Sequence, residues 1–166
     1  MISFVRIDDR MIHGQTVTRW SLEYPCDGII AVNDAAATNP VLKAAYKGAA
    51  PDKKVFIWTL DHFRESMGKV LESKTRYFLI TKSPLDMRTI LVDYGFKPSD
   101  VKTVVVGPCN DRPGAVKLGN NQSITPEEAQ ALEAITQAGY DVEFALLKDN
   151  AIGSWSKLLK VSQCSH

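Results

Sequence analysis

The first loop of the chain concentrates residues that can do chemistry. Residues 6–13 read Arg-Ile-Asp-Asp-Arg-Met-Ile-His, so two arginines, two aspartates and a histidine fall within eight positions. A histidine in such a place can be a metal ligand, a general base or a nucleophile. Metal binding would require further histidine or cysteine ligands, and the other histidines are His62 and the terminal His166. The two carboxylates keep a magnesium site open, although the flanking arginines disfavour a cation.

The arginines favour an anion instead. Arg6 and Arg10 carry planar guanidinium groups, which match the oxygens of a phosphoryl group. Backbone N–H groups at a helix start attract the same charge, and a helix is expected to begin near Gln15. Together these features indicate a phosphoryl site at His13. From the residues alone, a purely structural loop, in which Arg6 pairs with one of the two aspartates, is equally well supported.

Apolar, β-branched runs predict the strands that must position this loop. They are Ile2–Ile7, Gly28–Val32, Val55–Trp58, Tyr77–Ile80, Thr103–Val106 and Val142–Leu147. Nearly continuous apolar runs indicate strands covered on both faces. Helical signals separate the strands, which predicts one α/β domain over residues 1–166 with an open, mostly parallel sheet. We expect about six to seven strands with helices on both faces. Ligands of such sheets bind beyond the carboxyl ends of strands, where the first loop lies.

Helix signals support this alternation. Asparagine or serine followed by proline predicts helix starts at residues 39–40 and 83–84, and Thr125-Pro126-Glu127-Glu128 has the pattern of a capping box. The last helix has a stripe that is expected to be buried, consisting of Ala131, Leu132, Ile135 and Ala138. In the first helix, Val17, Trp20 and Tyr24 fall on one face and are expected to pack in the core.

The composition excludes several classes of protein. The 166 residues are 45% hydrophobic and 23% charged, as in globular proteins, and the net charge of +1 provides no long-range attraction to nucleic acid or anionic membranes. No apolar run approaches the roughly 20 residues of a membrane span, and no signal peptide is recognisable. Cys26, Cys109 and Cys164 are too few and too widely spaced for a disulfide framework or a structural zinc site. We therefore expect a cytoplasmic protein.

The run Val5–Gln15, Val-Arg-Ile-Asp-Asp-Arg-Met-Ile-His-Gly-Gln, closely resembles the signature of IIB components of the mannose/fructose/sorbose family of sugar phosphotransferase systems. An eleven-residue match is far more specific than a lone glycine motif. Further stretches that resemble the family are spread over nearly the whole chain: Ile29–Asp34, Ala49–Pro51, Thr81–Asp86 and Val105–Gly107.

The resemblance implies a phosphocarrier. In this family a IIA protein or domain, itself phosphorylated on histidine, donates to the histidine at the position of His13. IIB then phosphorylates a sugar that the membrane components IIC and IID carry into the cell. The resemblance also implies that Nδ1 receives the phosphoryl group and that no metal, nucleotide or other cofactor takes part. The sugar is not indicated, and a homo-oligomer stays open. The start at Met1 suggests a IIB chain separate from IIA.

The same resemblance assigns the site residues. It places the phosphoryl contacts at Arg6, at Arg10 and at backbone N–H groups near Gly14, with Gln15 as the next candidate. Thr59, expected at the end of the third strand, is a further candidate hydroxyl donor. Asp8 and Asp9 are expected to orient the arginines and not to contact phosphate, because like charges repel.

Two alternatives come from other classes. A receiver-like signalling domain would use Asp8 and Asp9 as its acidic pair and Asp61 after the third strand. Its fifth strand, however, should be followed by a lysine, and here Gly107 and Pro108 follow. A flavodoxin-like module for a small ligand or nucleotide would be expected to carry a glycine-rich loop after the first strand, and this chain has none.

A rival carrier residue also exists within the phosphotransferase interpretation. Cys109 follows the fifth strand, and other IIB families use a phosphocysteine, although they place it directly after the first strand. His62 is interpreted as a solvated or capping residue. Trp58 and Trp155 are interpreted as packing residues and not as sugar-stacking ones.

Overall fold

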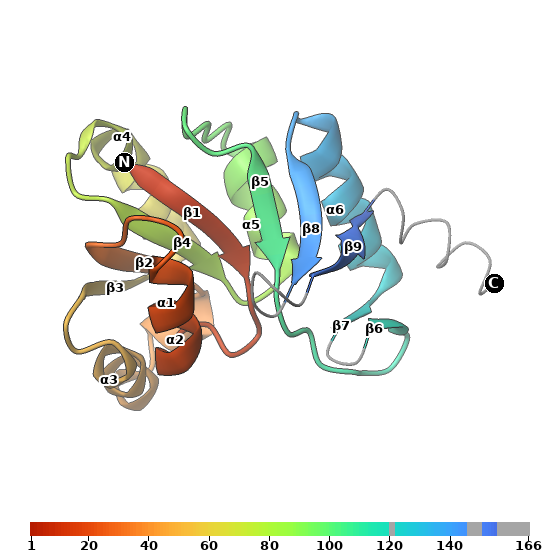
Figure 1. Cartoon of the computed structure of the whole chain (residues 1–166), viewed down its shortest axis with the longest axis horizontal. Helices are drawn as coiled ribbons and strands as arrows, with labels where there is room; N and C mark the ends of the chain where they lie inside the picture. Colours follow the sequence, from red (N-terminus) through yellow and green to blue (C-terminus); the bar gives the residue numbers. More distant parts are fainter. Residues whose placement is uncertain (120–121, 146–150, 156–166) are drawn as a thin grey trace.

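The main sheet of the protein has seven strands in the order β3-β2-β4-β1-β5-β8-β9 (Figure 1). The computed structural model describes residues 1–119, 122–145 and 151–155. The strands of this sheet are β1 (Ile2–Ile7), β2 (Gly28–Val32), β3 (Lys54–Trp58), β4 (Tyr77–Thr81), β5 (Thr103–Val106), β8 (Asp141–Ala145) and β9 (Ala151–Ser154). Every neighbouring pair is parallel except β8 and β9. This confirms the predicted fold class and places β1 between β4 and β5.

Helices cover both faces of the sheet. They are α1 (Gly14–Ser21), α2 (Asp34–Ala37), α3 (Pro40–Ala49), α4 (Leu60–Glu72), α5 (Pro84–Arg88), which continues as the π-helix η1 (Thr89–Asp93), and α6 (Pro126–Gln137). Figure 1 shows α1 and α3 on one face and α4, α5 and α6 on the other. Two hydrophobic clusters fill the two layers between helices and sheet.

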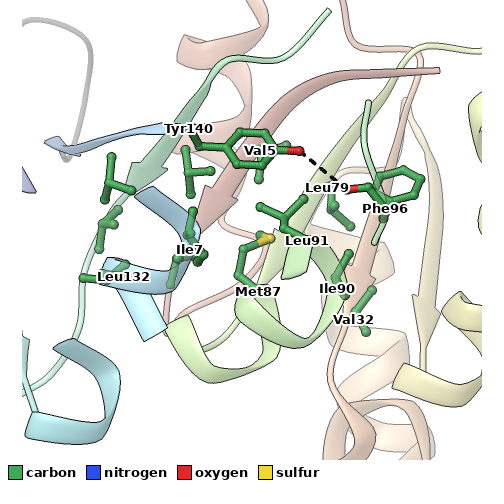
Figure 2. Packing of buried hydrophobic residues seen from close by; sticks show 14 of the residues in the cluster. Val5, Ile7, Val32, Leu79, Met87, Ile90, Leu91, Phe96, Leu132 and Tyr140 are labelled. Carbon is green, nitrogen blue, oxygen red and sulfur yellow. Dashed lines mark hydrogen bonds between the residues drawn. The ribbon is translucent and has the colours of Figure 1, made fainter. Parts of the chain in front are cut away.

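Strand alternation sends the side chains of β1 into different layers. Val5 and Ile7 join the cluster on the α5 and α6 side, where Leu79, Met87 and Leu132 pack with them (Figure 2). Phe4 belongs to the cluster on the α1 side. Arg6 has the same parity as Phe4, so its side chain enters the α1 layer.

Helix capping follows the sequence signals. Thr125 and Glu128 form the predicted capping box, and the side chains of Asn39 and Ser83 cap α3 and α5. Two core assignments are wrong at helix ends. Ala138 is exposed, because α6 ends at Gln137 and Ala138 is its C-cap. Tyr24 lies beyond the end of α1 and is 36% exposed, although its ring stacks on Phe4.

The carboxyl-terminal part differs from the expectation in its strands. A hairpin of β6 (Val116–Gly119) and β7 (Gln122–Ile124) precedes α6, and β9 pairs antiparallel with β8. Neither element was predicted. The predicted strand Val142–Leu147 is observed as far as Ala145, and its last two residues lie outside the described part. Trp155 is buried and donates its Nε1–H to Glu133 at 2.7 Å, which confirms a packing role.

Within the described ranges, none of the helices combines the length and the apolar character needed to span a bilayer.

Candidate phosphoryl-transfer site

The first loop is fastened to the strands on both sides of β1. The Asp8 backbone N–H donates to the Thr81 carbonyl at the end of β4, and the Asp9 N–H donates to the Pro108 carbonyl after β5, each at 2.9 Å. Met11 then adopts a left-handed backbone with φ of 55°, which is uncommon for a residue with a side chain. Its N–H closes the turn onto the Asp8 carbonyl at 2.9 Å. The loop therefore folds back tightly against the sheet.

Apolar burial explains the turn. Met11 and Ile12 are 2% and 4% exposed and belong to the α1-side cluster. Their burial anchors the loop and leaves the residues on either side, Arg10 and His13, nearer to solvent. The loop thus displays polar groups on a tightly packed apolar base.

His13 is the N-cap residue of α1. Its backbone is extended, its carbonyl accepts the Val17 N–H at 3.0 Å, and its side chain makes no capping hydrogen bond. The residue is half-buried. Its Nδ1 atom is covered and has no hydrogen-bond partner among the described residues. The N-terminus of α1 therefore lacks the side-chain acceptor that an N-cap residue usually supplies.

Arg6 and Asp8 form a buried ion pair beneath the loop. The distance from Arg6 Nε to Asp8 Oδ2 is 3.2 Å, and the two side chains are 2% and 1% exposed. This is the pairing that the structural interpretation of the loop expected. Burial lowers the pKa of the Arg6 guanidinium from its usual value, and the Asp8 carboxylate opposes that shift. Arg6 also donates through Nη1 to the Ala145 carbonyl at 3.1 Å.

Asp8 connects this pair to Arg10. Its second oxygen, Oδ1, accepts the Arg10 backbone N–H at 2.9 Å and lies 3.7 Å from Arg10 Nε. The Arg10 side chain is 42% exposed, so Arg10 is the arginine of the loop that a solvent-borne anion can reach. The expected role of Asp8 in orienting an arginine agrees with this geometry.

Asp9 faces the loop after β5. Its Oδ2 accepts the Asn110 backbone N–H at 2.7 Å, whereas its Oδ1 is covered and has no hydrogen-bond partner among the described residues. Burial raises the pKa of the Asp9 carboxyl, and the Asn110 hydrogen bond partly offsets the rise. A cavity of about 360 Å³ adjoins Asp9 and is also lined by Asn33, Lys82 and Ser83. The carboxyl edge of the sheet is thus hollowed next to the loop.

The remaining candidates occupy different places. Gly14 and Gln15 form the first turn of α1, directly after His13. A Cβ at Gly14 would lie 3.0 Å from the Ala49 carbonyl, so α3 approaches α1 closely there. Thr59 follows the edge strand β3 and is separated from β1 by β2 and β4. Its hydroxyl oxygen caps α4 by accepting the His62 N–H at 3.1 Å. Its predicted contact with phosphate stays a prediction.

His62 and Cys109, the other candidate residues, both lie where contacts or burial favour a structural role. The capping residue of α4 is Thr59 and not His62, whose exposed ring stacks on Trp58 at 4.5 Å. Cys109 is buried, and burial raises the pKa of its thiol to about 12. A thiol that stays protonated is a poor nucleophile. Across the described residues, no group of three or more His, Cys, Asp or Glu side chains is placed to hold a metal ion.

Three groups around Arg6 were not foreseen. The Trp20 ring lies 5.5 Å from Arg6 Cζ, the Ala145 carbonyl accepts from it, and Gly107 leaves room for it. Parity could have placed Arg6 and Trp20 in the same layer. The contact with Ala145 depends on the pairing of β8 with β5, which the sequence does not encode in any local pattern.

Comparison with known proteins shows the family to which the chain belongs. The family described as PTS system sorbose subfamily IIB component matches residues 2–166. The sorbose-specific EIIB component of Klebsiella pneumoniae is 28% identical over 166 residues, which cover 98% of each chain. The fructose-specific EIIB component of Bacillus subtilis (strain 168) is 26% identical over 96% of each chain. The mannose-specific EIIAB component of Escherichia coli (strain K12) is 28% identical, but the match spans only 43% of that longer protein.

Solved structures show the same architecture. The crystal structure of the IIBSor domain of the sorbose permease from Klebsiella pneumoniae has a TM-score of 0.84 at 27% identity, covering 98% of this chain and 97% of that one. The N-acetylgalactosamine-specific IIB component 1 from Escherichia coli has a TM-score of 0.81 over 89% of this chain; at 22% identity it supports the fold alone. The receiver-like and flavodoxin-like alternatives have no support in these matches.

Proposed function

Because the chain belongs to the sorbose-subfamily IIB components of sugar phosphotransferase systems, we propose that His13 carries the phosphoryl group. Phosphorylated IIA donates it, and the sugar entering through IIC and IID receives it. The chemistry is that of a protein-phosphohistidine–sugar phosphotransferase, carried out on the cytoplasmic side of the membrane. One observation carries the proposal: His13 is the N-cap of α1 but leaves the helix N-terminus without a side-chain acceptor.

That helix end is suited to hold phosphoryl oxygens. The first N–H groups of a helix have no partner within the helix, and the peptide dipoles place partial positive charge there. An N-cap side chain normally accepts one of these N–H groups, and His13 does not. A phosphoryl group on the imidazole would bring anionic oxygens to the amides of Gly14 and Gln15. Phosphohistidine would thereby become the missing cap of its own helix.

The ring nitrogen that attacks must carry a free electron pair. Nδ1 is uncommitted among the described residues, which supports the assignment that the family resemblance implies. The atom is covered in this structure, so a rotation about the side-chain torsions of His13 has to expose it before a donor can reach it. The N-cap position favours such a rotation, because no capping hydrogen bond has to break.

Each of the two transfers forms one bond to phosphorus and breaks one. In the first, the Nδ1 electron pair forms an N–P bond while the N–P bond of the IIA phosphohistidine breaks and returns its electron pair to the donor ring. In the second, a sugar hydroxyl oxygen attacks phosphorus, the N–P bond of His13 breaks, and the hydroxyl proton leaves to solvent or a nearby base. The transition states are loose and spread charge over the equatorial oxygens, so positioning and electrostatic stabilisation dominate catalysis.

Arg10 supplies the reachable cation for that charge. Its guanidinium is partly exposed at the loop tip, and Asp8 fixes its backbone. A charge-assisted hydrogen bond from it would contribute roughly 1.5–3 kcal/mol. Asp9, whose Oδ2 is held by Asn110, would repel the phosphoryl group and discourage excessively tight binding. A carrier needs that balance because it must release what it accepts.

The same surface has to meet two partners. One histidine cannot face the active site of IIA and the sugar in the membrane components at once, so the face around residues 8–15 docks each partner in turn. The named relatives act on sorbose, fructose and mannose, which supports a hexose as the class of acceptor.

The test is phosphorylation of the purified chain by phosphorylated IIA, followed by mass spectrometry. Wild type should gain one phosphoryl group on the peptide that contains His13, and His13→Ala should gain none while its melting temperature is unchanged. His62→Ala is the matched control and should behave as wild type, since that ring is exposed and stacks on Trp58, away from the first loop. The modification should be lost in acid and survive base. A phosphorylated His13→Ala variant would refute the assignment.

A further inference from the structure

Among the residues that the structure describes, groups from four separate parts of the chain enclose Arg6. Its Nε contacts Asp8, its Nη1 donates to the Ala145 carbonyl, the Trp20 ring lies 5.5 Å from its Cζ, and Gly107 borders the guanidinium. Only 2% of the side chain is exposed. A cation buried to this extent is held in one orientation by its partners, and removing it from water costs energy that the partners must offset.

Gly107 is the feature that makes this enclosure possible. A Cβ at this position would lie 2.7 Å from Arg6 Cζ and closer still to Nη2, a separation that non-bonded carbon atoms do not tolerate. The backbone φ of Gly107 is not positive, so an L-residue could adopt its conformation. The glycine is therefore required for space and not for chain flexibility.

Asp8 passes the position of Arg6 on to the loop tip. Its two oxygens serve different partners: Oδ2 faces Arg6 Nε, and Oδ1 accepts the Arg10 backbone N–H. Because one carboxylate joins both, a displacement of the Arg6 guanidinium has a direct route to the acceptor of the Arg10 N–H. The two guanidinium groups and one carboxylate also leave a net charge of +1, and the Arg10 end of the cluster is the exposed one.

From this geometry we propose that Arg6 is a positioning residue, which acts through Asp8 to hold Arg10 in place, and that Gly107 is required for this. The inference rests on the proposed function, because it assigns Arg6 a role in that reaction other than phosphoryl contact. It also identifies Gly107 as a determinant of activity although it carries no functional group.

The first experiment uses the resting protein and no phosphoryl donor. Gly107→Ala in the ¹⁵N-labelled full chain should shift both the Arg6 Nε–H resonance and the Arg10 backbone amide resonance. Gly68→Ala is the matched control, because a Cβ there would meet nothing within 4 Å, and it should leave both signals in place. An Arg10 amide that stays unchanged while the Arg6 signal moves would overturn the proposal.

A second measurement needs no variant, so it remains decisive even if Gly107→Ala fails to fold. When wild type is phosphorylated, the Arg10 Nε–H resonance should move and the Arg6 Nε–H resonance should move far less. The reverse pattern would make Arg6 the phosphoryl contact and refute the positioning role.

Kinetics complete the test. Gly107→Ala should lower the single-turnover rate constant for transfer from phosphorylated IIA by roughly 10- to 100-fold, as expected for misplacement of a catalytic group. The half-saturating concentration of IIA should change much less, because the buried base of the docking loop, Met11 and Ile12, is not altered. A loss confined to affinity would contradict the proposal. If wild type itself takes up no phosphoryl group on His13, the proposed function fails, and the resonances of the resting protein still decide whether Arg6 positions Arg10.

Discussion

Asp9 and Asn110 lie 101 positions apart in the chain, yet the Asn110 backbone N–H donates to Asp9 Oδ2 at 2.7 Å. This hydrogen bond joins the loop after β1 to the loop after β5, and the neighbouring Asp9 N–H to Pro108 carbonyl bond reinforces it. Two hydrogen bonds therefore join the loops at the centre of the sheet, and a carboxylate lies in the contact between them.

Asp9→Asn should stabilise the protein at neutral pH. Burial raises the pKa of Asp9, so the folded state binds a proton more tightly than the unfolded state, and stability falls as the pH rises through that range. Asparagine keeps the oxygen that accepts from Asn110 and avoids the charge, but its NH2 group takes the covered Oδ1 position, where no partner lies among the described residues, and this reduces the gain. The gain should stay below about 1 kcal/mol, because solvent screens a partly exposed group. Urea unfolding at pH 7 and at pH 4 measures it; a gain that fails to shrink at pH 4 would contradict this origin.

Arg10→Lys should slow phosphoryl transfer without affecting the fold. A point charge cannot reproduce the planar fork of a guanidinium, and the loss of one charge-assisted hydrogen bond of about 1.5 kcal/mol corresponds to roughly a tenfold lower rate. Rapid-quench single-turnover transfer from IIA measures it, with Arg19→Lys, in the last turn of α1, as the control. Equal rates for wild type and Arg10→Lys would remove Arg10 from the mechanism.

Asp8→Ala should destabilise the protein strongly. The substitution leaves the buried Arg6 guanidinium without its carboxylate, and breaking a buried ion pair in this way costs about 3–5 kcal/mol. Asp27→Ala removes one partner of the exposed pair with Arg76 and should cost little in comparison. Chemical denaturation of the two variants side by side tests the contrast. Similar losses in both would show that burial does not set the cost.

Thr125→Ala should destabilise the protein by about 1 kcal/mol through the N-terminus of α6. The variant loses the hydroxyl that accepts the Glu128 N–H at 3.2 Å, while Glu128 Oε1 still accepts the residue 125 N–H. Thr125→Ser keeps the hydroxyl and should retain most of the stability. Thermal unfolding followed by circular dichroism distinguishes them, and a serine variant as unstable as the alanine variant would argue against capping.

Alkaline pH should destabilise the fold through Cys109. Burial raises the pKa of its thiol from 9.0 to about 12, so between these values the unfolded chain loses a proton that the folded protein keeps. Stability is then full below pH 9 and falls as the pH rises, by at most about 1.4 kcal/mol per pH unit from this group. Cys109→Ala should show a shallower decline between pH 9 and pH 11 than wild type. Parallel declines would assign the effect to other groups.

Much of the fold could be predicted because its signals are local. Apolar runs such as Gly28–Val32 are recognisable as buried strands, and the capping box at Thr125 is a pattern of four residues. The antiparallel strand β9 could not be predicted, because its pairing with β8 depends on contacts across the sheet and not on a local pattern.

The functional site also combines features that local sequence predicts with features that depend on distant contacts. His13 and the arginines could be identified from their types and spacing, and the pairing of Arg6 with an aspartate was one of two expected outcomes. That Arg6 is buried while Arg10 is exposed follows from strand parity and from Met11 and Ile12 turning into the core. The importance of space at Gly107 is visible only once β5 lies beside β1. The chemistry that a side chain can perform follows from its residue type. The burial of that side chain depends on residues that are distant in sequence.

The hydrogen bond from Arg6 to the Ala145 carbonyl joins residues that are 139 positions apart. During synthesis it can therefore form only after Ala145 has been added. The ribosome makes His13 well before strand β8, so an acceptor of the buried Arg6 guanidinium is missing until β8 has been made. Domains generally fold as units, so a nascent chain that ends before β8 should carry the histidine without a finished site. Competence to receive phosphate would then begin only after strand β8 has been translated.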